Sequence, residues 1–157
     1  MKKTIFSLKG KSFCIRQIEL TDFTNEYFNL LNQLSITNVD KFDENKNRLF
    51  VNSLGNKHYI CIIEDVDSQK IIGTGTLLIE DKIIHNYGKV GHIEDIVIDK
   101  QYRGLELGRL MIEYLTDFSK LDINCYKCIL NCDENLIKFY QKCGYKINGV
   151  EMSMYFK

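Results

Sequence analysis

The chain has 157 residues, of which 45% are hydrophobic and 27% are charged, and its 21 basic residues balance its 21 acidic ones. This length allows one domain with a sizeable core, and the composition excludes wholesale disorder. A formal net charge of zero argues against a protein whose main task is binding nucleic acid, because such proteins carry a basic excess.

The N-terminal segment, MKKTIFSLKGKSF, has too few apolar residues before Lys9 and Lys11 for the core of a signal peptide. No later stretch approaches the roughly 18–20 uninterrupted apolar residues of a membrane span. We therefore expect a cytoplasmic protein without a membrane span, in which the six cysteines are reduced. Residues 1–157 show no linker or internal repeat and are expected to form a single domain.

The first predicted elements are a strand and a helix. Residues 12–18 predict a strand, and Thr21 offers an N-cap for the helix that follows. Apolar residues at helical spacing mark the buried face of this helix: Phe23, Tyr27, Leu30, Leu31 and Leu34.

A helix and a hairpin come next. A second, weaker helix is expected over residues 43–54, before Gly55. Residues 58–66 (HYICIIEDV) and 70–80 (KIIGTGTLLIE) flank the turn DSQK and predict two antiparallel strands.

The second half of the chain alternates strands with helices. Residues 90–99 predict a fourth strand, which leads through a glycine-rich loop into a helix that reaches about Ser119. A fifth strand is expected over residues 125–132. A right-handed crossover through a helix connects parallel strands, so the fourth and fifth strands should be parallel.

The C-terminal region predicts a short helix over residues 135–143, terminated by Gly144, and a last strand over residues 150–156. Strands followed by the order strand–helix–strand–helix–strand indicate one mixed α/β or α+β domain.

The CYKC sequence at 125–128 has the spacing of half a zinc site. No second CxxC or HxxxH follows it, and strand alternation points Cys125 and Cys128 to opposite faces. We interpret both cysteines as small apolar packing residues and expect no metal.

The loop at residues 103–109 combines glycines and arginines at the start of a helix. The first amides of a helix lack internal partners and carry partial positive charge. Gly104 and Gly108 let the backbone approach an oxygen-rich group, and Arg103 and Arg109 add fixed charges. The loop matches neither a Walker A motif nor GxGxxG. Taken alone, it leaves a pyrophosphate site and a simple tight turn as open alternatives.

Four motifs together favour the pyrophosphate site. The loop, Gln101-x-Arg103-Gly104-x-x-x-Gly108, follows a strand and resembles the coenzyme A loop, Q/R-x-x-G-x-G/A, of the GNAT superfamily of N-acetyltransferases. The runs KIIH, GHIEDIVIDKQYRG, CYKCILNC and FYQKCGY resemble the branch of this family that acetylates glucosamine 6-phosphate. The similarity covers most of the chain from about Ile60 onward.

This resemblance implies a fold and a reaction. The GNAT fold has a mixed central sheet, flanked by helices and splayed between strands 4 and 5, where it takes the pantetheine like an extra strand. The implied reaction transfers the acetyl group of acetyl-CoA, the co-substrate, to the 2-amino group of D-glucosamine 6-phosphate. The product, N-acetylglucosamine 6-phosphate, would serve UDP-N-acetylglucosamine synthesis. The family also implies a homodimer with shared active sites.

The resemblance assigns acetyl-CoA to the fourth strand and the loop. Glu106 stands where the family's middle glycine usually falls. Because a carboxylate facing a pyrophosphate would be repelled, we expect its side chain to point to solvent and its amide to face the ligand. Asn131 matches a family aspartate that contacts the cofactor. The expected cofactor-binding residues are Ile96, Val97, Ile98, Arg103, Gly104, Leu105, Glu106, Leu107, Gly108, Arg109 and Asn131.

Three side chains match catalytic positions of the family. Tyr140 matches a tyrosine that assists the departing thiolate. Because a phenol has a pKa of about 10 against about 8.5 for a thiol, we expect it to donate a hydrogen bond rather than its proton. Glu94 and Asp95 match acids that contact the sugar. In a regular strand they face opposite sides, and a bulge would re-aim one of them. Because no Cys–His or Ser–His–Asp arrangement is evident, direct attack by the amine is the economical mechanism.

The resemblance also nominates residues for the sugar phosphate. Lys82 and His85 would come from the partner subunit. Tyr155 stands where relatives carry an arginine, which leaves three alternatives open: weaker phosphate binding, compensation by Lys127 or Lys157, or a different substrate. The expected substrate-binding residues are Ser35, Lys82, His85, Glu94, Asp95, Tyr126 and Lys127.

Other classes of function stay open at this point. One alternative is a GNAT enzyme that acts on a polyamine, an antibiotic or a protein amine. A polyamine or peptide substrate would require an acidic groove, whereas KIIH and the Tyr126–Lys127 pair supply cations. A non-catalytic acyl-CoA-binding module would leave Tyr140 and the two acids idle. An α/β domain without a small-molecule role would not respond to acetyl-CoA.

Overall fold

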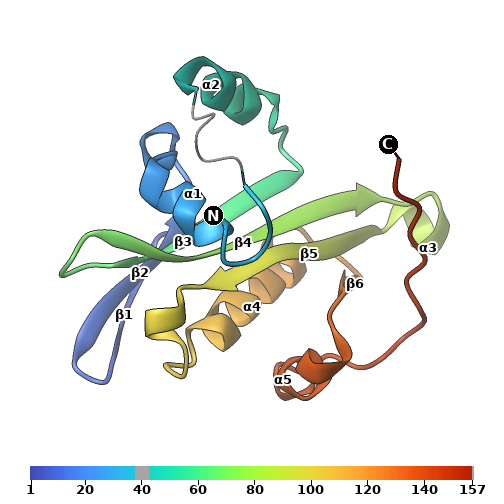
Figure 1. Ribbon diagram of the computed structural model, residues 1–157. Coiled ribbons are helices and arrows are strands. Elements are labelled where there is room, and N and C mark those ends of the chain that lie inside the picture. The colour runs from blue at the N-terminus through green and yellow to red at the C-terminus, as the bar shows by residue number, and fades with distance from the viewer. Residues whose placement is uncertain (38–42, 157) are drawn as a thin grey trace.

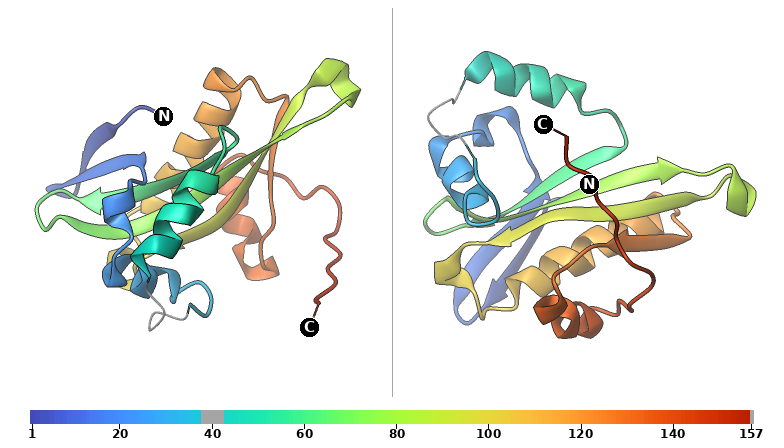
Figure 2. Two further views of the ribbon diagram at one scale, coloured as in Figure 1. Left: turned by 90° about the horizontal axis from the view of Figure 1, so that it is seen from above. Right: turned by 45° about the vertical axis from the view of Figure 1, so that its right-hand side comes forward.

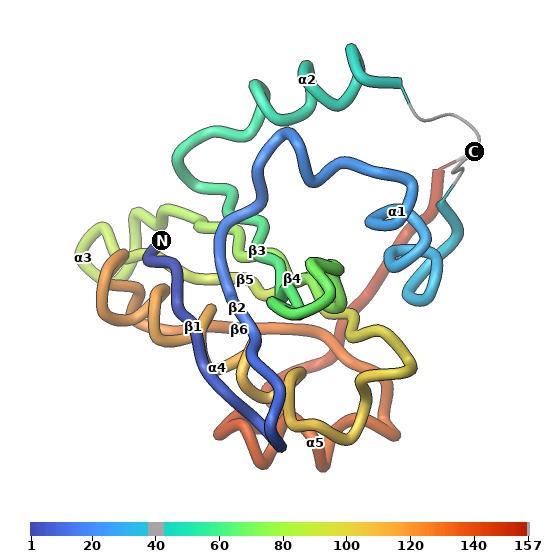
Figure 3. Tube along the Cα trace, turned by 90° about the vertical axis from the view of Figure 1, so that its left-hand side faces the viewer, coloured from blue at the N-terminus to red at the C-terminus, as the bar shows by residue number. Residues whose placement is uncertain are grey.

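The computed structural model describes residues 1–37 and 43–156 of the chain; Lys157 lies outside them. Within these residues, six strands form one mixed sheet in the order β1-β2-β3-β4-β5-β6. Helices cover both faces of this sheet, with α1 and α2 on one side and α4 on the other (Figure 1). The tube view of Figure 3 shows the same two layers from the end of the sheet.

The sheet begins with an edge hairpin. β1 (Thr4–Leu8) pairs antiparallel with β2 (Lys11–Gln17) across a turn in which Lys9 and Gly10 both have positive φ. β2 confirms the strand expected over 12–18. β1 has no counterpart among the predicted elements, because most of its side chains are exposed and the alternating pattern of an edge strand is weak.

The central strands follow their predicted ranges closely. β3 (His58–Asp65), β4 (Lys70–Asp81) and β5 (Lys89–Ile98) are antiparallel neighbours. Their side chains on both faces are covered by helices, so the strands carry long apolar runs. The fully buried residues of β3 and β4 include Ile62, Ile63, Ile72 and Leu77.

The first helix starts later and ends earlier than predicted. α1 (Asn25–Leu31) is capped by Thr24, whose hydroxyl accepts the Tyr27 amide at 3.3 Å. Thr21 instead lies in a short 3₁₀ helix, η1 (Leu20–Asp22), so its prediction as the cap is wrong. Leu34 lies beyond the end of α1 and is 46% exposed, so it does not belong to the buried stripe.

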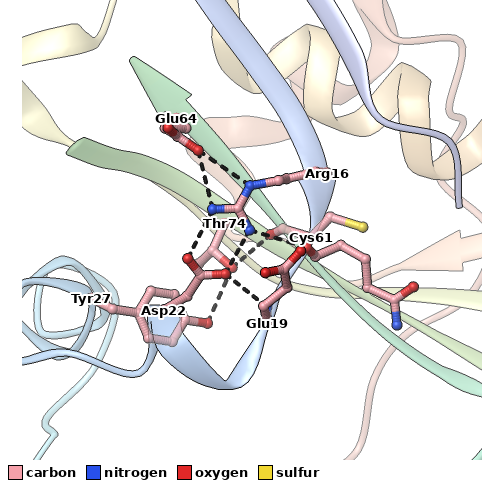
Figure 4. Close-up of polar contacts among 8 residues, drawn as sticks. Arg16, Glu19, Asp22, Tyr27, Cys61, Glu64 and Thr74 are labelled. Carbon is pink, nitrogen blue, oxygen red and sulfur yellow. Dashed lines mark hydrogen bonds and ion pairs between the residues drawn. The ribbon is translucent and has the colours of Figure 1, made fainter. Parts of the chain in front are cut away.

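An ion cluster fixes the entry of α1 onto the sheet. The Arg16 guanidinium on β2 donates to Asp22 Oδ2 at 2.6 Å and to Glu64 Oε2 on β3 at 3.1 Å. The buried Asp22 carboxylate also accepts the Glu19 amide at 2.7 Å (Figure 4). Hydrogen bonding to Asp22 raises the pKa of Arg16 above its ordinary value. The cluster therefore anchors the chain just before α1.

The other two long helices match their predictions. α2 (Glu44–Ser53) is capped by Asp43, which accepts two amides. α4 (Leu107–Asp117) continues as a π-helix, η4 (Phe118–Asp122). The buried stripe of α4 packs against β4 and β5 and comprises Leu107, Met111, Ile112 and Leu115.

β6 (Lys127–Leu130) is parallel to β5, as the crossover predicts, but it is shorter than the expected 125–132. Cys125 precedes the strand, so the alternation argument does not apply to it. It is buried, and Cys128 packs against the same core. Both cysteines therefore serve as small apolar packing residues.

The C-terminal region holds one helix and no final strand. η5 (Glu134–Leu136) leads into α5 (Ile137–Lys142), close to the predicted 135–143. The prediction of a strand over residues 150–156 is wrong. These residues have no regular structure and stand off from the sheet (Figure 2). A strand forms only where its amides find a neighbouring edge, and within the described residues this segment pairs with none.

Candidate active site

The sheet opens between β5 and β6, the fourth and fifth of the predicted strands. Their parallel pairing runs only from Val90 opposite Lys127 to Ile93 opposite Leu130. β5 continues to Ile98, so the edge of residues 94–98 that would face β6 has no strand beside it. The predicted splay is therefore present. It leaves backbone amides available to an extended ligand.

A bulge lies on β5 at the opening. Against β4, the register shifts between Thr74 and Thr76, and Asp95 has a left-handed φ of 53°. The bulge confirms that Glu94 and Asp95 do not sit in a regular strand. Gly75 lies opposite it, and a Cβ there would be 2.5 Å from Ile96 Cδ1 and 3.1 Å from Leu115 Cδ1. A side chain at residue 75 would displace these apolar side chains, so the bulge packs closely against a glycine.

A cleft of about 410 Å³ lies at this opening. It gathers six of the predicted site residues: Ser35, Glu94, Asp95, Ile96, Asn131 and Tyr140. The chain after β6 and the C-terminal segment supply residues that were not predicted: Cys132, Asp133, Leu136 and Glu151, together with Leu34 after α1 and Ile93 on β5. Cys132 and Asp133 directly follow Asn131 at the carboxyl end of a strand, which is a signal for site residues. Glu151 carries no such signal.

Two of the titratable side chains of the cleft, Glu94 and Tyr140, have shifted pKa values. Burial, followed by the nearby Asp95 charge, raises the pKa of Glu94 above its ordinary value. Burial also raises the pKa of Tyr140. The cleft therefore combines a phenol that stays protonated at neutral pH with a carboxylate that is more basic than an exposed one. This pairing suits proton movement between an amine and a leaving group.

The loop after β5 enters α4 through two left-handed residues. Gly104 has a φ of 77°, and Glu106, the N-cap of α4, has a φ of 60°. The Glu106 side chain does not cap the helix. It is 65% exposed and accepts a hydrogen bond from Arg109 Nε at 2.9 Å. The first-turn amides are therefore not covered by this carboxylate.

Both arginines of the loop have protein partners. Arg109 also donates to Glu113 Oε1 at 2.5 Å, and these two carboxylates raise its pKa. Arg103 Nε donates to the Ile98 carbonyl at 3.2 Å. The backbone amides are therefore the hydrogen-bond donors of the loop that are most available to a ligand.

Neighbouring elements hold the loop and Tyr140 in place. A Cβ on Gly108 would lie 3.3 Å from the Phe139 ring, so this glycine lets α5 pack on the first turn of α4 and fixes the adjacent Tyr140. Gln33, just after α1, accepts the Lys100 amide and donates to Asp99, both at 2.9 Å. That bridge holds the Ser35 turn beside the end of β5.

The remaining predicted residues gather elsewhere. Tyr126 and Lys127 lie at the start of β6, at the opposite end of the β5–β6 pairing from the cleft. The rings of His85 and Tyr126 are 4.3 Å apart, and Lys127 Nζ lies 5.8 Å from the Tyr126 ring. Lys82 forms an ion pair with Glu80. His85 belongs to α3 (Ile84–Tyr87) at the tip of the β4–β5 hairpin, where residues 85–87 all have positive φ. Within one chain, this group is separate from the cleft.

Neither a metal cluster nor a membrane-spanning helix is found among the described residues. No group of three or more histidines, cysteines, aspartates or glutamates in residues 1–37 and 43–156 has the arrangement of a metal site. No helix among the same residues has the length and apolar character needed to span a bilayer.

Comparison with known proteins gives consistent matches. The model of the Acetyltransferase (GNAT) family matches residues 16–145. Glucosamine 6-phosphate N-acetyltransferase of Arabidopsis thaliana is 42% identical over 149 residues, covering 94% of this chain and 99% of the relative. Glucosamine 6-phosphate N-acetyltransferase 1 of Dictyostelium discoideum is 38% identical over 94% of this chain and 83% of its own length.

A solved structure agrees with these matches. The crystal structure of the glucosamine-6-phosphate N-acetyltransferase from Arabidopsis thaliana superimposes with a TM-score of 0.82 at 39% identity, over 92% of this chain and 99% of that one. The family model, the relatives and the splayed sheet lead to one conclusion. The chain belongs to the acetyltransferase (GNAT) family.

Proposed function

We propose that the chain transfers the acetyl group of acetyl-CoA to the 2-amino group of D-glucosamine 6-phosphate. The product is N-acetylglucosamine 6-phosphate, a precursor of UDP-N-acetylglucosamine. The names of relatives that match over nearly their whole length support the substrate. The observation that carries the proposal is the cleft at the parted strands, which holds Glu94, Asp95 and Tyr140 together.

The reaction is a direct attack of the amine on the thioester carbonyl. The C–N bond forms, and the negative charge of the tetrahedral intermediate falls on the carbonyl oxygen. Amides of the unpaired β5 edge, over residues 96–98, stabilise that oxygen. Each such donor contributes about 3–4 kcal/mol in comparable sites. The C–S bond then breaks and the thiolate leaves.

Three side chains of the cleft assist these steps. Tyr140 donates a hydrogen bond to the developing thiolate, which suits a phenol whose pKa is raised by burial. Glu94 and Asp95 bind and orient the amine, and the more basic Glu94 receives its proton directly or through water. Asn131 borders the same cleft and contacts the pantetheine.

The coenzyme A diphosphate binds at the start of α4. The donors are the amides of residues 103–109, whose helix start is not capped by the Glu106 side chain. Leu107 is fully buried and anchors the loop. Arg103 and Arg109 border the site, and Glu106 offsets part of their charge.

The sugar phosphate site needs a second copy of the chain. Ser35, Glu94 and Asp95 line the cleft, whereas the cationic group of Lys82, His85, Tyr126 and Lys127 lies at the other end of β5. We therefore propose a homodimer in which Lys82 and His85 reach the partner's cleft. Exposed apolar side chains support an interface there: Ile83, Ile84, Tyr87, Val150, Met152, Met154, Tyr155 and Phe156.

The chain works as one N-acetyltransferase domain, residues 1–157, in the cytoplasm. One sheet that runs through both halves of the chain supports a single domain. Six free cysteines suit a reducing compartment.

A thiol-release assay tests the reaction. The chain is incubated with acetyl-CoA and, separately, glucosamine 6-phosphate, glucosamine, spermidine or a lysine peptide. We expect the highest kcat/KM with glucosamine 6-phosphate. A preference for plain glucosamine would contradict the phosphate roles of Lys82 and Lys127, and a preference for spermidine or the peptide would contradict the proposed substrate.

A further inference from the structure

We infer that a second cavity, on the α1–α2 side of the sheet, binds a compact aromatic amine that carries an oxygen at its far end. The cavity has a volume of about 340 Å³ and lies between α1, α2 and strands β3 to β5. Of the residues that line it, only Asp95 also lines the cleft. None of the steps proposed above uses the rest of this space.

The walls of the cavity are largely aromatic. Phe23 and Tyr27 are buried, with ring centroids 5.7 Å apart, and Phe50 of α2 lies 6.2 Å from Phe23. Leu31 and Ile60 complete the apolar lining. A volume of this size, at the low end for small-molecule sites, suits one ring with a short chain.

Two polar side chains of the wall, those of Thr76 and Asn47, make no side-chain hydrogen bond within the described residues. Thr76 is 5% exposed, and within the described residues its hydroxyl makes no hydrogen bond. By contrast, the Thr74 hydroxyl donates to the Cys61 carbonyl at 2.9 Å and lies 3.3 Å from the Tyr27 hydroxyl (Figure 4). The Asn47 Nδ2 atom is itself fully buried and has no partner among these residues. Because buried polar atoms are normally paired, it indicates a ligand with an accepting atom, and the Thr76 hydroxyl of the cavity wall is left for a polar atom of the same ligand.

The charges at the two ends set the orientation of that ligand. Asp95, in the β5 bulge, lines the cavity. A carboxylate beside aromatic faces favours an ammonium. Lys46 and Asn47 border the α2 end of the cavity. Because both side chains are hydrogen-bond donors, this end disfavours a cation and favours an oxygen that accepts a hydrogen bond. The ammonium therefore lies at Asp95, and the oxygen lies toward α2.

Occupancy of this cavity should affect acetyl transfer. This consequence rests on the proposed function, in which Asp95 contacts the amine of glucosamine 6-phosphate. A ligand ammonium at Asp95 competes with that amine, so the ligand acts as a competitive inhibitor against the sugar.

Binding of tyramine to the full chain, measured by calorimetry at pH 7, tests the site without relying on activity. Tyrosol replaces the ammonium by a hydroxyl, and phenethylamine lacks the ring oxygen. We expect tyrosol to bind at least about tenfold more weakly than tyramine, and phenethylamine about fivefold more weakly. Equal binding of tyrosol, or no binding of tyramine at millimolar concentration, would overturn the inference.

Matched variants locate the probe. Asn47→Phe fills the cavity and should weaken tyramine binding at least about tenfold, whereas Arg48→Ala, on the exposed side of the same helix, should not change it. Thr76→Val removes only the hydroxyl and should weaken binding about fivefold; it serves if Asn47→Phe does not fold. Unchanged binding in the folded cavity variants would refute this location.

The two proposals fail in different ways. If tyramine binds as expected but glucosamine 6-phosphate releases no thiol from acetyl-CoA, the proposed function is wrong and the cavity site stands. If thiol release is normal but tyramine does not bind, the cavity site alone is wrong.

Discussion

Tyr140 and Glu94 share one cleft, and the proposed reaction needs them in opposite protonation states. The phenol must keep its proton to donate to a thiolate, and the carboxylate must lose its proton to accept one from an amine. Burial raises the pKa of both groups. For Tyr140 this shift helps, because the donor stays protonated over a wider range. For Glu94 it makes a stronger base but destabilises the charged form in the folded protein.

Replacing Tyr140 by phenylalanine tests the donor. Tyr140→Phe should lower kcat by roughly 10- to 10³-fold with little change in the KM for glucosamine 6-phosphate, because only the transition state loses an interaction. Since the pKa of Tyr140 lies above the ordinary value of about 10, wild-type kcat should not fall through loss of the phenol proton below about pH 10. Steady-state kinetics measured as a function of pH check the fall in kcat of the variant and the pH range of the wild-type kcat. An unchanged kcat would remove Tyr140 from the mechanism.

Replacing Glu94 by glutamine should lower the activity and raise the stability of the folded protein. The pKa of Glu94 is higher in the folded protein than in the unfolded chain, where it is about 4.3. Wild type therefore loses stability as the pH rises from the unfolded-state pKa through the folded-state pKa. Above the folded-state pKa the loss is complete. Glu94→Gln lacks this penalty, so its Tm should exceed that of wild type at pH 7.5, and the difference should vanish near pH 4. Its kcat should fall at both pH values. Equal Tm values at pH 7.5 would contradict the shift.

At the scale of elements, the opposed β4 and β5 strands create the bulge. Asp95 takes a left-handed φ opposite Gly75, and Ile96, Leu115 and Met111 fill the space that a side chain at residue 75 would need. The bulge therefore packs against a residue twenty positions earlier in the chain.

Gly75→Ala should disturb this bulge. Met111 and Leu115 are fully buried and cannot yield easily, so the added methyl group should cost about 1–3 kcal/mol of unfolding free energy. We also expect kcat to fall, because Ile96 carries part of the amide edge. The matched control is Gly55→Ala, where a Cβ would meet no atom within 4 Å. Denaturant unfolding and kinetics compare the two, and equal effects would refute the packing argument.

A second prediction concerns Glu106 at the start of α4. Glu106→Gln removes a negative charge beside the proposed diphosphate site and releases one contact of Arg109. The KM for acetyl-CoA should fall several-fold with kcat unchanged, and the effect should shrink at high salt because the site is exposed. Glu44→Gln, on α2, is the control. A KM that rises would mean that Glu106 supports the loop rather than opposing the ligand.

At the scale of the whole molecule, the apolar C-terminal segment stands apart from the sheet. Val150 is 93% exposed, and Met152, Met154 and Phe156 are similarly uncovered. Isolated chains rarely leave such a run in water. This segment and the hairpin tip around Ile83 are two exposed apolar surfaces that the proposed second subunit would cover.

Removal of residues 150–157 tests the homodimer. Sedimentation should show a dimer for the full chain and a monomer for the shortened one, which should also lose most acetyl transfer to glucosamine 6-phosphate. Lys2→Ala and Lys3→Ala, at the opposite terminus, serve as controls. A full chain that sediments as a monomer at enzymatic concentrations would refute the shared active site.

The amino-acid sequence was enough to predict the central strands, the long helices and the family. Their signals are local: the alternation of β3 and β4, the stripe of α4 and the loop from Gln101 to Gly108 each occupy neighbouring residues. The resemblance to the family placed Glu94, Asp95 and Tyr140 among the candidates. The C-terminal segment alternates apolar residues in the same way, yet it forms no strand within the described chain.

Only the tertiary structure decided which of these residues meet. β5 and β6 part after Ile93 and Leu130, and the resulting cleft joins Tyr140 to Glu94 across 46 residues of sequence while leaving Lys127 at the other end. The cavity at Thr76 also depends on α2 lying over the sheet. Such arrangements follow from the packing of distant elements against one core, and no pattern within a few neighbouring residues encodes them.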